Sequence, residues 1–361
     1  MMMTILNVTT QLLAGLLVLA TALPLANIDH WLVRGFDFPR LQIAIGLVLV
    51  AALEASLLLG GWGGSVWLLL LVLAALAWQL RWIIEYLPIF PREVDSQPPE
   101  ATETLKILTS NVLTPNRDSP ALLALVREYK PDVLVTLESD DWWQDALSAL
   151  HDDYPHRLAC PLDNLYGMHL YSRWPLHDAR IDYLVEDDKP SMYARLETPR
   201  GETIRCHFLH PAPPSPSENE ESTERDAELL VVARDLADED GPVIVTGDLN
   251  VVAWSRTTRE FRKISRLLDP RVGRGMFNTF NAKYWFLRWP LDHIFHSEHF
   301  YFKRIIRLPG IGSDHFPLYT ELAFHPLGDS AEVRPEVDEE DLAWSKKKMR
   351  EGDVSPEDVP G

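Results

Sequence analysis

Polar side chains that can bind metals or transfer protons stand where β-rich segments of this chain end. Six such segment ends carry carboxylates, amides or imidazoles: Asn111, Glu138, His210, Asp248 with Asn250, Asp292 with His293, and Asp314 with His315. A single Asn or Asp at such a position would be an ordinary turn residue. Six ends of these types together predict a constellation that core strands present to a crevice.

The residue types indicate which chemistry this constellation would perform. Hard oxygen ligands without cysteine suit Mg²⁺ or Mn²⁺. Two histidines, with an aspartate to orient one of them, suit activation of water and stabilisation of phosphoryl charge. The chain has no Gly-x-Ser-x-Gly elbow, no His-Glu-x-x-His and no Walker loop. The residues alone therefore predict a metal-assisted hydrolase of phosphate esters.

The elements that must position these side chains occupy residues 103–326. Short β-rich runs alternate with stretches of helical periodicity, of which the clearest cover residues 119–130, 218–237 and 255–268. Strand-like runs outnumber helical ones, and several helices separate strands. This pattern predicts an α/β domain of packed β-sheets with outer helices.

Three apolar runs precede this domain, at residues 4–26, 41–59 and 65–84. Each is long enough for one helical crossing of a bilayer, which predicts a membrane region over residues 1–87 with three transmembrane helices. The first run lacks the basic start and the small-residue cleavage site of a signal peptide, and two more runs follow it. A proline-rich linker is predicted over residues 88–102.

The basic residues near the apolar runs predict the orientation of the chain. Arg34, Arg40, Arg81 and Arg92 would all lie on one side of three crossings, whereas the N-terminus and the turn at residues 60–64 carry no Lys or Arg. The positive-inside rule then places the large domain in the cytoplasm.

Charge and cysteine content exclude several classes of protein. The chain has 53 acidic and 34 basic residues, a net charge of −19, which argues against a protein that coats duplex DNA. Two cysteines rule out a disulfide scaffold. Residues 327–361 hold 11 Asp or Glu against 5 Lys or Arg and few apolar residues, so this segment is predicted to be a disordered acidic tail.

At the segment ends the chain resembles the endonuclease/exonuclease/phosphatase superfamily, which includes DNase I and the neutral sphingomyelinases. The resemblance covers roughly residues 103–325, and within the superfamily the chain closely resembles the membrane-anchored bacterial YafD-like branch. The matching pieces are Ser110-Asn111-Val112, Leu137-Glu138-Ser139, Gly167 through Ser172-Arg173, His210-Pro211, Gly247-Asp248-Leu249-Asn250 with Trp254-Ser255, Leu291-Asp292-His293-Ile294 and Ser313-Asp314-His315-Phe316-Pro317. It implies a four-layer α/β sandwich of two packed β-sheets with outer helices. It also implies a bacterial inner-membrane protein.

The resemblance implies a role for each of eight residues. Glu138 would be the principal Mg²⁺ ligand, with Asn111 and Asp314 helping to hold the metal. Asp248 would position or deprotonate the attacking water. His315, oriented by Asp292, would face the scissile phosphate, while Asn250 would contact the phosphate and His210 would donate to a phosphoryl oxygen.

The sequence leaves three functions open. The favoured one is a membrane-tethered, Mg²⁺-dependent phosphoesterase acting on a lipid headgroup or a small phosphodiester, with the bilayer as a partner. A nuclease is the second. Two residues weaken the particular case of abasic-site repair: Leu113, where abasic-site endonucleases have an acidic residue, and His210, where they have Tyr but DNase I has His. A non-catalytic binding protein is the third, and it predicts loss of Glu138, Asp248 or His315, which are all present.

Two surface features bear on the substrate. Seven basic residues crowd into residues 256–274, a stripe that would either meet anionic lipid or a polyanionic substrate, or be a solvated helix face. An aromatic cluster precedes Asp292 and would either line the mouth of a pocket or belong to the core; it comprises Tyr284, Trp285, Phe286 and Trp289.

Overall fold

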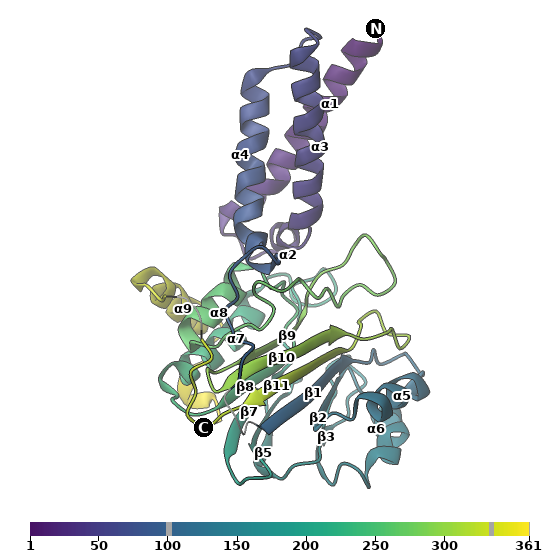
Figure 1. Ribbon diagram of the computed structural model, residues 1–361, viewed down its shortest axis with the longest axis vertical. Helices are drawn as coiled ribbons and strands as arrows, with labels where there is room; N and C mark the ends of the chain where they lie inside the picture. The colour runs from purple at the N-terminus through teal and green to yellow at the C-terminus, as the bar shows by residue number, and fades with distance from the viewer. Residues whose placement is uncertain (99–102, 332–335, 361) are drawn as a thin grey trace.

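The computed structural model of this chain describes residues 1–98, 103–331 and 336–360. Three long helices form a bundle that stands on one side of a larger α/β domain (Figure 1). They are α1 (Met2–Ala22), α3 (Arg40–Leu59) and α4 (Val66–Ile83). Short helical turns extend or join them: η1 (Leu23–Ala26), α2 (Trp31–Arg34), η2 (Gly35–Asp37) and η3 (Ile84–Tyr86).

These three helices match the three predicted spans. Each is long and apolar enough to cross a membrane by length and composition. Only 22%, 39% and 22% of their most apolar windows is buried inside the protein, so most of their apolar side chains face outward. An exposed apolar surface of this extent marks an interaction surface.

The α/β domain contains two mixed β-sheets. The six-stranded sheet has the order β10-β11-β1-β2-β4-β3 and the five-stranded sheet the order β5-β6-β7-β8-β9. The strands of the first sheet are β1 (Glu103–Asn111), β2 (Val133–Leu137), β3 (His156–Cys160), β4 (Met168–Ser172), β10 (Phe300–Arg307) and β11 (Leu318–Phe324). Those of the second are β5 (Leu176–Asp182), β6 (Ser191–Glu197), β7 (Thr203–Leu209), β8 (Val243–Asp248) and β9 (Asp292–His296).

Helices cover the outer face of each sheet, which produces the predicted four layers. The inner faces share one apolar core, to which β1, β2, β4, β6, β7 and β8 all contribute. Helices α5 (Ser119–Tyr129) and α6 (Asp141–Ala146) pack outside the six-stranded sheet. Helices α7 (Thr223–Asp235) and α8 (Arg256–Ser265) pack outside the five-stranded one. Central strands such as β2 and β8 are buried along their whole length, as a sheet covered on both faces requires.

The segment predicted to be a disordered tail is ordered over most of its length. Residues 336–360 contain α9 (Glu339–Glu351) and η6 (Pro356–Asp358). A capping box between Asp338 and Asp341 begins α9, and Met349 packs into the apolar cluster outside the five-stranded sheet. Composition recorded the excess of acid but not the apolar contacts that Leu342, Trp344 and Met349 of α9 make with the domain. Residues 332–335 and 361, and residues 99–102 of the predicted linker, lie outside the described residues.

Candidate active site

Strand direction brings the predicted site residues to one edge of the sandwich. Strands β1 and β2 are parallel, as are β7 and β8, so the residues that end them meet at the carboxyl edge of each pair. Strands β9 and β11 run antiparallel to β8 and β1, so they begin at that same edge. The side chains collected there are Asn111, Glu138, His210, Asp248, Asp292, Asp314 and His315.

Alternation along β1 and β8 explains why these side chains point inward. The hydroxyl groups of Thr109 and Thr246 lie 2.9 Å apart across the two sheets. Two residues further along each strand, Asn111 Nδ2 donates to Asp248 Oδ2 at 3.1 Å. Since successive side chains of a strand alternate between its faces, both pairs project between the sheets. The two sheets are therefore joined by polar contacts at the edge that carries the site.

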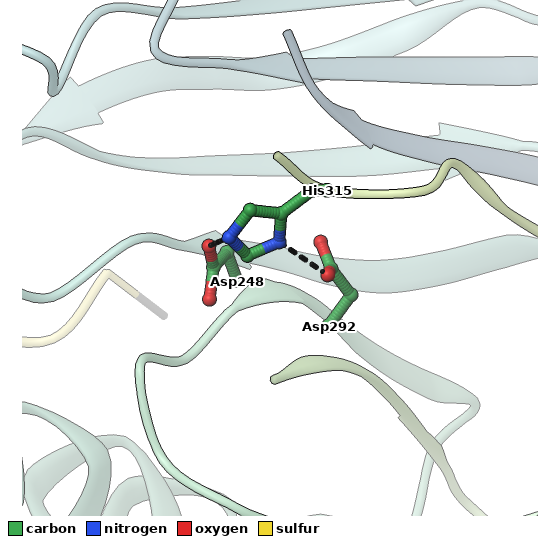
Figure 2. Close-up of side chains that lie close together, drawn as sticks. All are labelled: Asp248, Asp292 and His315. Carbon is green, nitrogen blue, oxygen red and sulfur yellow. Dashed lines mark hydrogen bonds and ion pairs between the residues drawn. The ribbon is translucent and has the colours of Figure 1, made fainter. Parts of the chain in front are cut away.

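His315 lies between two carboxylates (Figure 2). Its Nδ1 lies 2.8 Å from Asp292 Oδ2, and its Nε2 lies 3.3 Å from Asp248 Oδ2. Burial lowers the pKa of the imidazole, but Asp248 and Asp292 outweigh this effect and raise that pKa to about 10. The ring is therefore cationic at neutral pH, and the shorter bond to Asp292 sets its orientation.

Glu138 offers a carboxylate oxygen that the protein leaves unsatisfied. Glu138 follows β2 with a left-handed φ of +57°, and its Oε1 accepts a hydrogen bond from Asn111 Nδ2 at 2.6 Å. Its Oε2 is buried and has no hydrogen-bond partner among the described residues. Burial raises the pKa of this carboxyl group to about 7. A desolvated oxygen of this kind fits a hard divalent cation, whose charge would favour the ionised form.

A second set of atoms at this edge could also hold a metal ion. One ligand atom from each of Asp248, Asp292 and His315 lies within 4.8 Å of the others, although a metal ion could bind His315 there only after the imidazolium had lost a proton. This compact group differs from the predicted metal set of Glu138, Asn111 and Asp314. The two sets adjoin each other, because Asn111 bonds both Glu138 and Asp248.

Asp314 lies at the edge of the constellation. It is partly exposed, and its carboxylate makes no hydrogen bond or ion pair in the described part of the chain. Its charge contributes to raising the pKa values of Glu138 and His315, so it lies within electrostatic range of both. It also holds the neighbouring aromatic loop, because its backbone oxygen accepts from Ala282 N at 2.6 Å.

His210 and Asn250 connect the two loops that follow β7 and β8. His210 is buried, and burial lowers its pKa to about 4, so its ring is neutral at pH 7. Asn250 donates from its backbone to Asp248 Oδ1 at 3.1 Å and from Nδ2 to the Pro211 oxygen at 3.0 Å. The Pro211 oxygen therefore accepts one of the two hydrogens on Asn250 Nδ2. The second hydrogen could be donated to a phosphate oxygen.

Two aromatic walls and one buried ion pair were not predicted from the sequence. Tyr166 lies against His210, and Phe280 against His315, with ring centroids 5.2 and 4.9 Å apart. Arg271 is fully buried and forms an ion pair with Asp269 at 2.8 Å. Its Nη1 also donates to the backbone carbonyl oxygen of Asp292 at 3.2 Å. Arg271 belongs to the basic stripe at residues 256–274, but no motif or cluster in the sequence marks Tyr166 or Phe280.

Replacing Arg271 by Ala should destabilise the domain by about 3–5 kcal/mol, because Asp269 would remain buried without its partner. Burial raises the pKa of Asp269, but Arg271 outweighs it and holds that pKa at about 2. The pair therefore stabilises the fold above about pH 4, and that contribution is lost as the pH falls toward 2. Thermal unfolding of the full chain in detergent would measure the change. Arg127→Ala, at an exposed residue on α5, is the control; an equal midpoint for both variants would contradict the prediction.

Most of the basic stripe is engaged in ion pairs within the protein. Arg259 and Arg262 on α8 pair with Glu85 at 2.9 and 3.3 Å, at the end of the N-terminal helical bundle. Arg262 also pairs with Glu93 of the linker at 2.8 Å, and Lys263 with Asp341 of α9 at 2.9 Å. Most of the stripe therefore fastens the bundle, the linker and α9 to the domain.

Several solved structures share this fold. They include the endonuclease/exonuclease/phosphatase from Beutenbergia cavernae (19% identity, TM-score 0.52, 66% of this chain and 76% of that chain covered). They also include D. rerio TDP2 complexed with a single-strand DNA product (17% identity, TM-score 0.51, 61% and 99% covered) and the human Nocturnin catalytic domain with a bound sulfate (19% identity, TM-score 0.50, 65% and 98% covered). At 17–19% sequence identity, this similarity is evidence for the fold alone.

Comparison of the sequence with protein families gives the assignment. No curated protein matches the chain. The model of the Endonuclease/Exonuclease/phosphatase family matches residues 108–315, which is more than half of the chain and runs from β1 to the histidine at the centre of the site. The chain therefore belongs to the endonuclease/exonuclease/phosphatase family of metal-dependent phosphoester hydrolases.

Proposed function

We propose that this protein is a membrane-tethered, Mg²⁺- or Mn²⁺-dependent phosphoesterase of the membrane-anchored YafD-like branch. It hydrolyses a lipid headgroup or a small phosphodiester by attack of water on phosphorus. The observation that carries the proposal is the cationic His315 held between Asp248 and Asp292, beside the unsatisfied carboxylate of Glu138.

Each residue of the site has a role in this reaction. Asp248 positions the attacking water and accepts its proton. His315, oriented by Asp292, stabilises charge that develops on the phosphoryl group. His210 and Asn250 donate to phosphate oxygens, and Glu138, Asn111 and Asp314 would hold the metal. A bound divalent cation would supply polarisation of the phosphoryl group and neutralisation of its charge.

The position of the site beside the membrane bundle supports a lipid substrate. Trp289 packs on Phe38, which precedes α3, with ring centroids 5.7 Å apart, and Gln42 of α3 donates to the Phe286 oxygen at 3.0 Å. This aromatic loop, residues 280–289, contacts His315 through Phe280. It therefore joins the site to the end of the bundle, where a leaflet would begin.

The tip of the aromatic loop has the side chains of a membrane interface. Tyr284, Trp285 and Phe286 are 52%, 81% and 53% exposed, and Lys283 and Arg288 flank them. Tyr and Trp are enriched at the boundary between bilayer and water. These residues would hold the entrance of the site against the headgroup layer.

Replacing Tyr284, Trp285 and Phe286 together by Ala should lower hydrolysis of phospholipid in vesicles by about tenfold or more, because each ring adds on the order of 1 kcal/mol of interfacial binding. Hydrolysis of a soluble diester should change little. Trp62→Ala removes a Trp that is also half exposed, in the turn at the far end of the bundle, and serves as the control. Equal losses of activity on both substrates would show that the loop shapes the active site and does not bind the protein to the bilayer.

The orientation of the chain is part of the proposal. The four arginines that flank the apolar runs, Arg34, Arg40, Arg81 and Arg92, lie on the side of the domain and support a cytoplasmic domain at a bacterial inner membrane. A nuclease fits this surface less well, since the chain is strongly acidic and most of the α8 cations are paired within the protein. Single-stranded DNA, phospholipid vesicles and a small diester, offered to one preparation, would distinguish these substrate classes.

A further inference from the structure

A cavity of about 620 Å³ lies between the ends of the membrane helices and the domain. Its walls come from the end of α1, the segment that leads into α3, the end of α4, the linker, α8 and α9. Figure 1 shows this junction at the lower end of α4, above α8. None of the eight predicted site residues lines it. Its volume is in the range of ligand-binding pockets, and it is a second site, separate from the proposed active site.

Three arginines that line this cavity have donors to spare. Arg81 lies with its guanidinium 5.4 Å from the Trp78 ring and has no carboxylate partner among the described residues. Arg256 lies over the Trp344 ring and makes only long polar contacts, with Asn27 Oδ1 at 3.4 Å and with the carboxylates of Glu340 and Glu260 at 3.5 and 3.9 Å, so these donors could turn to a better acceptor. Arg259 makes its hydrogen bonds through Nη2 alone. Their remaining N–H groups suit the oxygens of a phosphate.

The carboxylates in the lining do not cancel these donors. Seven cationic side chains and six carboxylic acids line the cavity. Glu93 and Asp341 are already paired with Arg262 and Lys263 at 2.8 and 2.9 Å. Glu85 pairs with Arg262 at 3.3 Å and with Nη2 of Arg259 at 2.9 Å, which leaves the Nη1 and Nε donors of Arg259 unengaged within the described part of the chain. Burial, followed by the neighbouring Asp341, raises the pKa of Glu260 to about 8, so this group is mostly neutral at pH 7. The cavity is therefore slightly cationic.

The remaining walls suit the rest of an amphiphile. Pro24, Leu25 and Phe90 supply apolar surface. The indole Nε1 atoms of Trp78 and Trp82 have no hydrogen-bond partner among the described residues. The cavity lies at the ends of helices long enough to span a bilayer, the depth at which phospholipid headgroups lie.

We propose that this cavity binds the phosphate of an anionic phospholipid from the leaflet that faces the domain. Arg81, Arg256 and Arg259 donate to the phosphate oxygens, and the acyl chains lie along the outer surfaces of α1 and α4. The bound lipid contacts the bundle and α8 at once, so it fastens the membrane region to the domain. This site differs from the substrate site, and its occupancy does not depend on catalysis.

Native mass spectrometry of the full chain in detergent tests the proposal by binding alone. The probes are phosphatidylglycerol, phosphatidylcholine and inorganic phosphate. We expect phosphatidylglycerol to be retained in preference to phosphatidylcholine. The variant Arg81→Ala with Arg256→Ala should weaken that retention roughly 30-fold, about fivefold for each arginine, because neither residue makes a short ion pair whose loss would harm the fold.

Two control comparisons show whether any loss of lipid retention is specific to the cavity. Arg127→Ala, an exposed arginine on α5, should retain lipid as the native chain does, and circular dichroism checks that the double variant is folded. The Lys substitutions Arg81→Lys and Arg256→Lys should recover part of the binding. Equal retention of the two lipids, or native retention by the folded double variant, would overturn the proposal. Displacement of phosphatidylglycerol by millimolar inorganic phosphate would assign the cavity to free phosphate instead.

Discussion

His315→Ala should lower the turnover of an activated phosphodiester by about three orders of magnitude. The substitution removes a buried cation aimed at the position where phosphoryl charge develops, and such groups contribute roughly 10²–10⁴-fold to rate. It also leaves Asp248 and Asp292 facing each other without the imidazolium that lies between them. The loss should therefore appear in kcat rather than in KM.

The measurement compares initial rates of the full chain in detergent for native protein and variants. His177→Ala is the matched control, because His177 is an exposed histidine that pairs with Glu197 on strand β6. Asp292→Asn should cause a smaller loss than His315→Ala, since it weakens the bond that orients the ring but keeps the ring. Activity of a folded His315→Ala protein within threefold of native would remove this residue from the reaction.

Chelation of divalent metal should abolish turnover, and Mg²⁺ or Mn²⁺ should restore it. Glu138→Gln should raise the metal concentration needed for half-maximal rate by about 100-fold, because the neutral amide loses the charge that attracts a hard cation. The unsatisfied Oε2 of Glu138 is the atom on which this expectation rests.

A thermal-shift titration gives a readout of the same site that does not depend on activity. Metal should raise the melting temperature of the native chain, since a ligand that binds only the folded state stabilises it. The shift should be lost in Glu138→Gln and kept in Glu128→Gln, a change at an exposed glutamate on α5. Undiminished turnover after exhaustive chelation would contradict metal dependence.

Much of the fold was predictable because strand-end residues and apolar runs are local features. The three apolar runs predicted the three bundle helices, and the β-rich runs with intervening helices predicted packed β-sheets with outer helices. The resemblance to the family added that the sheets are two and the layers four. Alternation along β1 and β8 also explains how Asn111 and Asp248 come together although 137 positions separate them. Because side chains alternate between the two faces of a strand, one buried residue identifies the others that face the core.

What the sequence did not predict depends on partners distant along the chain. Acidic composition predicted disorder after residue 326, but α9 gains its order from packing against the cluster outside the five-stranded sheet and from Lys263 pairing with Asp341. The stripe on α8 looked free because Glu85 and Glu93, which pair with it, precede it by about 170 residues. No local pattern reveals such pairings.

The site shows the same division between local and distant information. The residue types at the strand ends indicated a phosphate-ester hydrolase, and the family assignment agrees with that class. The compact grouping of Asp248, Asp292 and His315 depends on the antiparallel register of β8 and β9 and on the segment before β11. Tyr166 packs against His210, and Phe280 packs against His315. Neither aromatic residue belongs to a motif, so these contacts are recognised only in the folded structure.

Hydrolysis of an activated phosphodiester in ¹⁸O-labelled water tests the central claim most directly. The purified full chain is assayed with Mg²⁺ and with chelator, and the phosphate product is analysed for label. We expect turnover only with metal and one ¹⁸O atom in each phosphate product, because water attacks phosphorus. Label in the released alcohol, or no turnover by folded protein that binds metal, would contradict metal-assisted attack of water at this site.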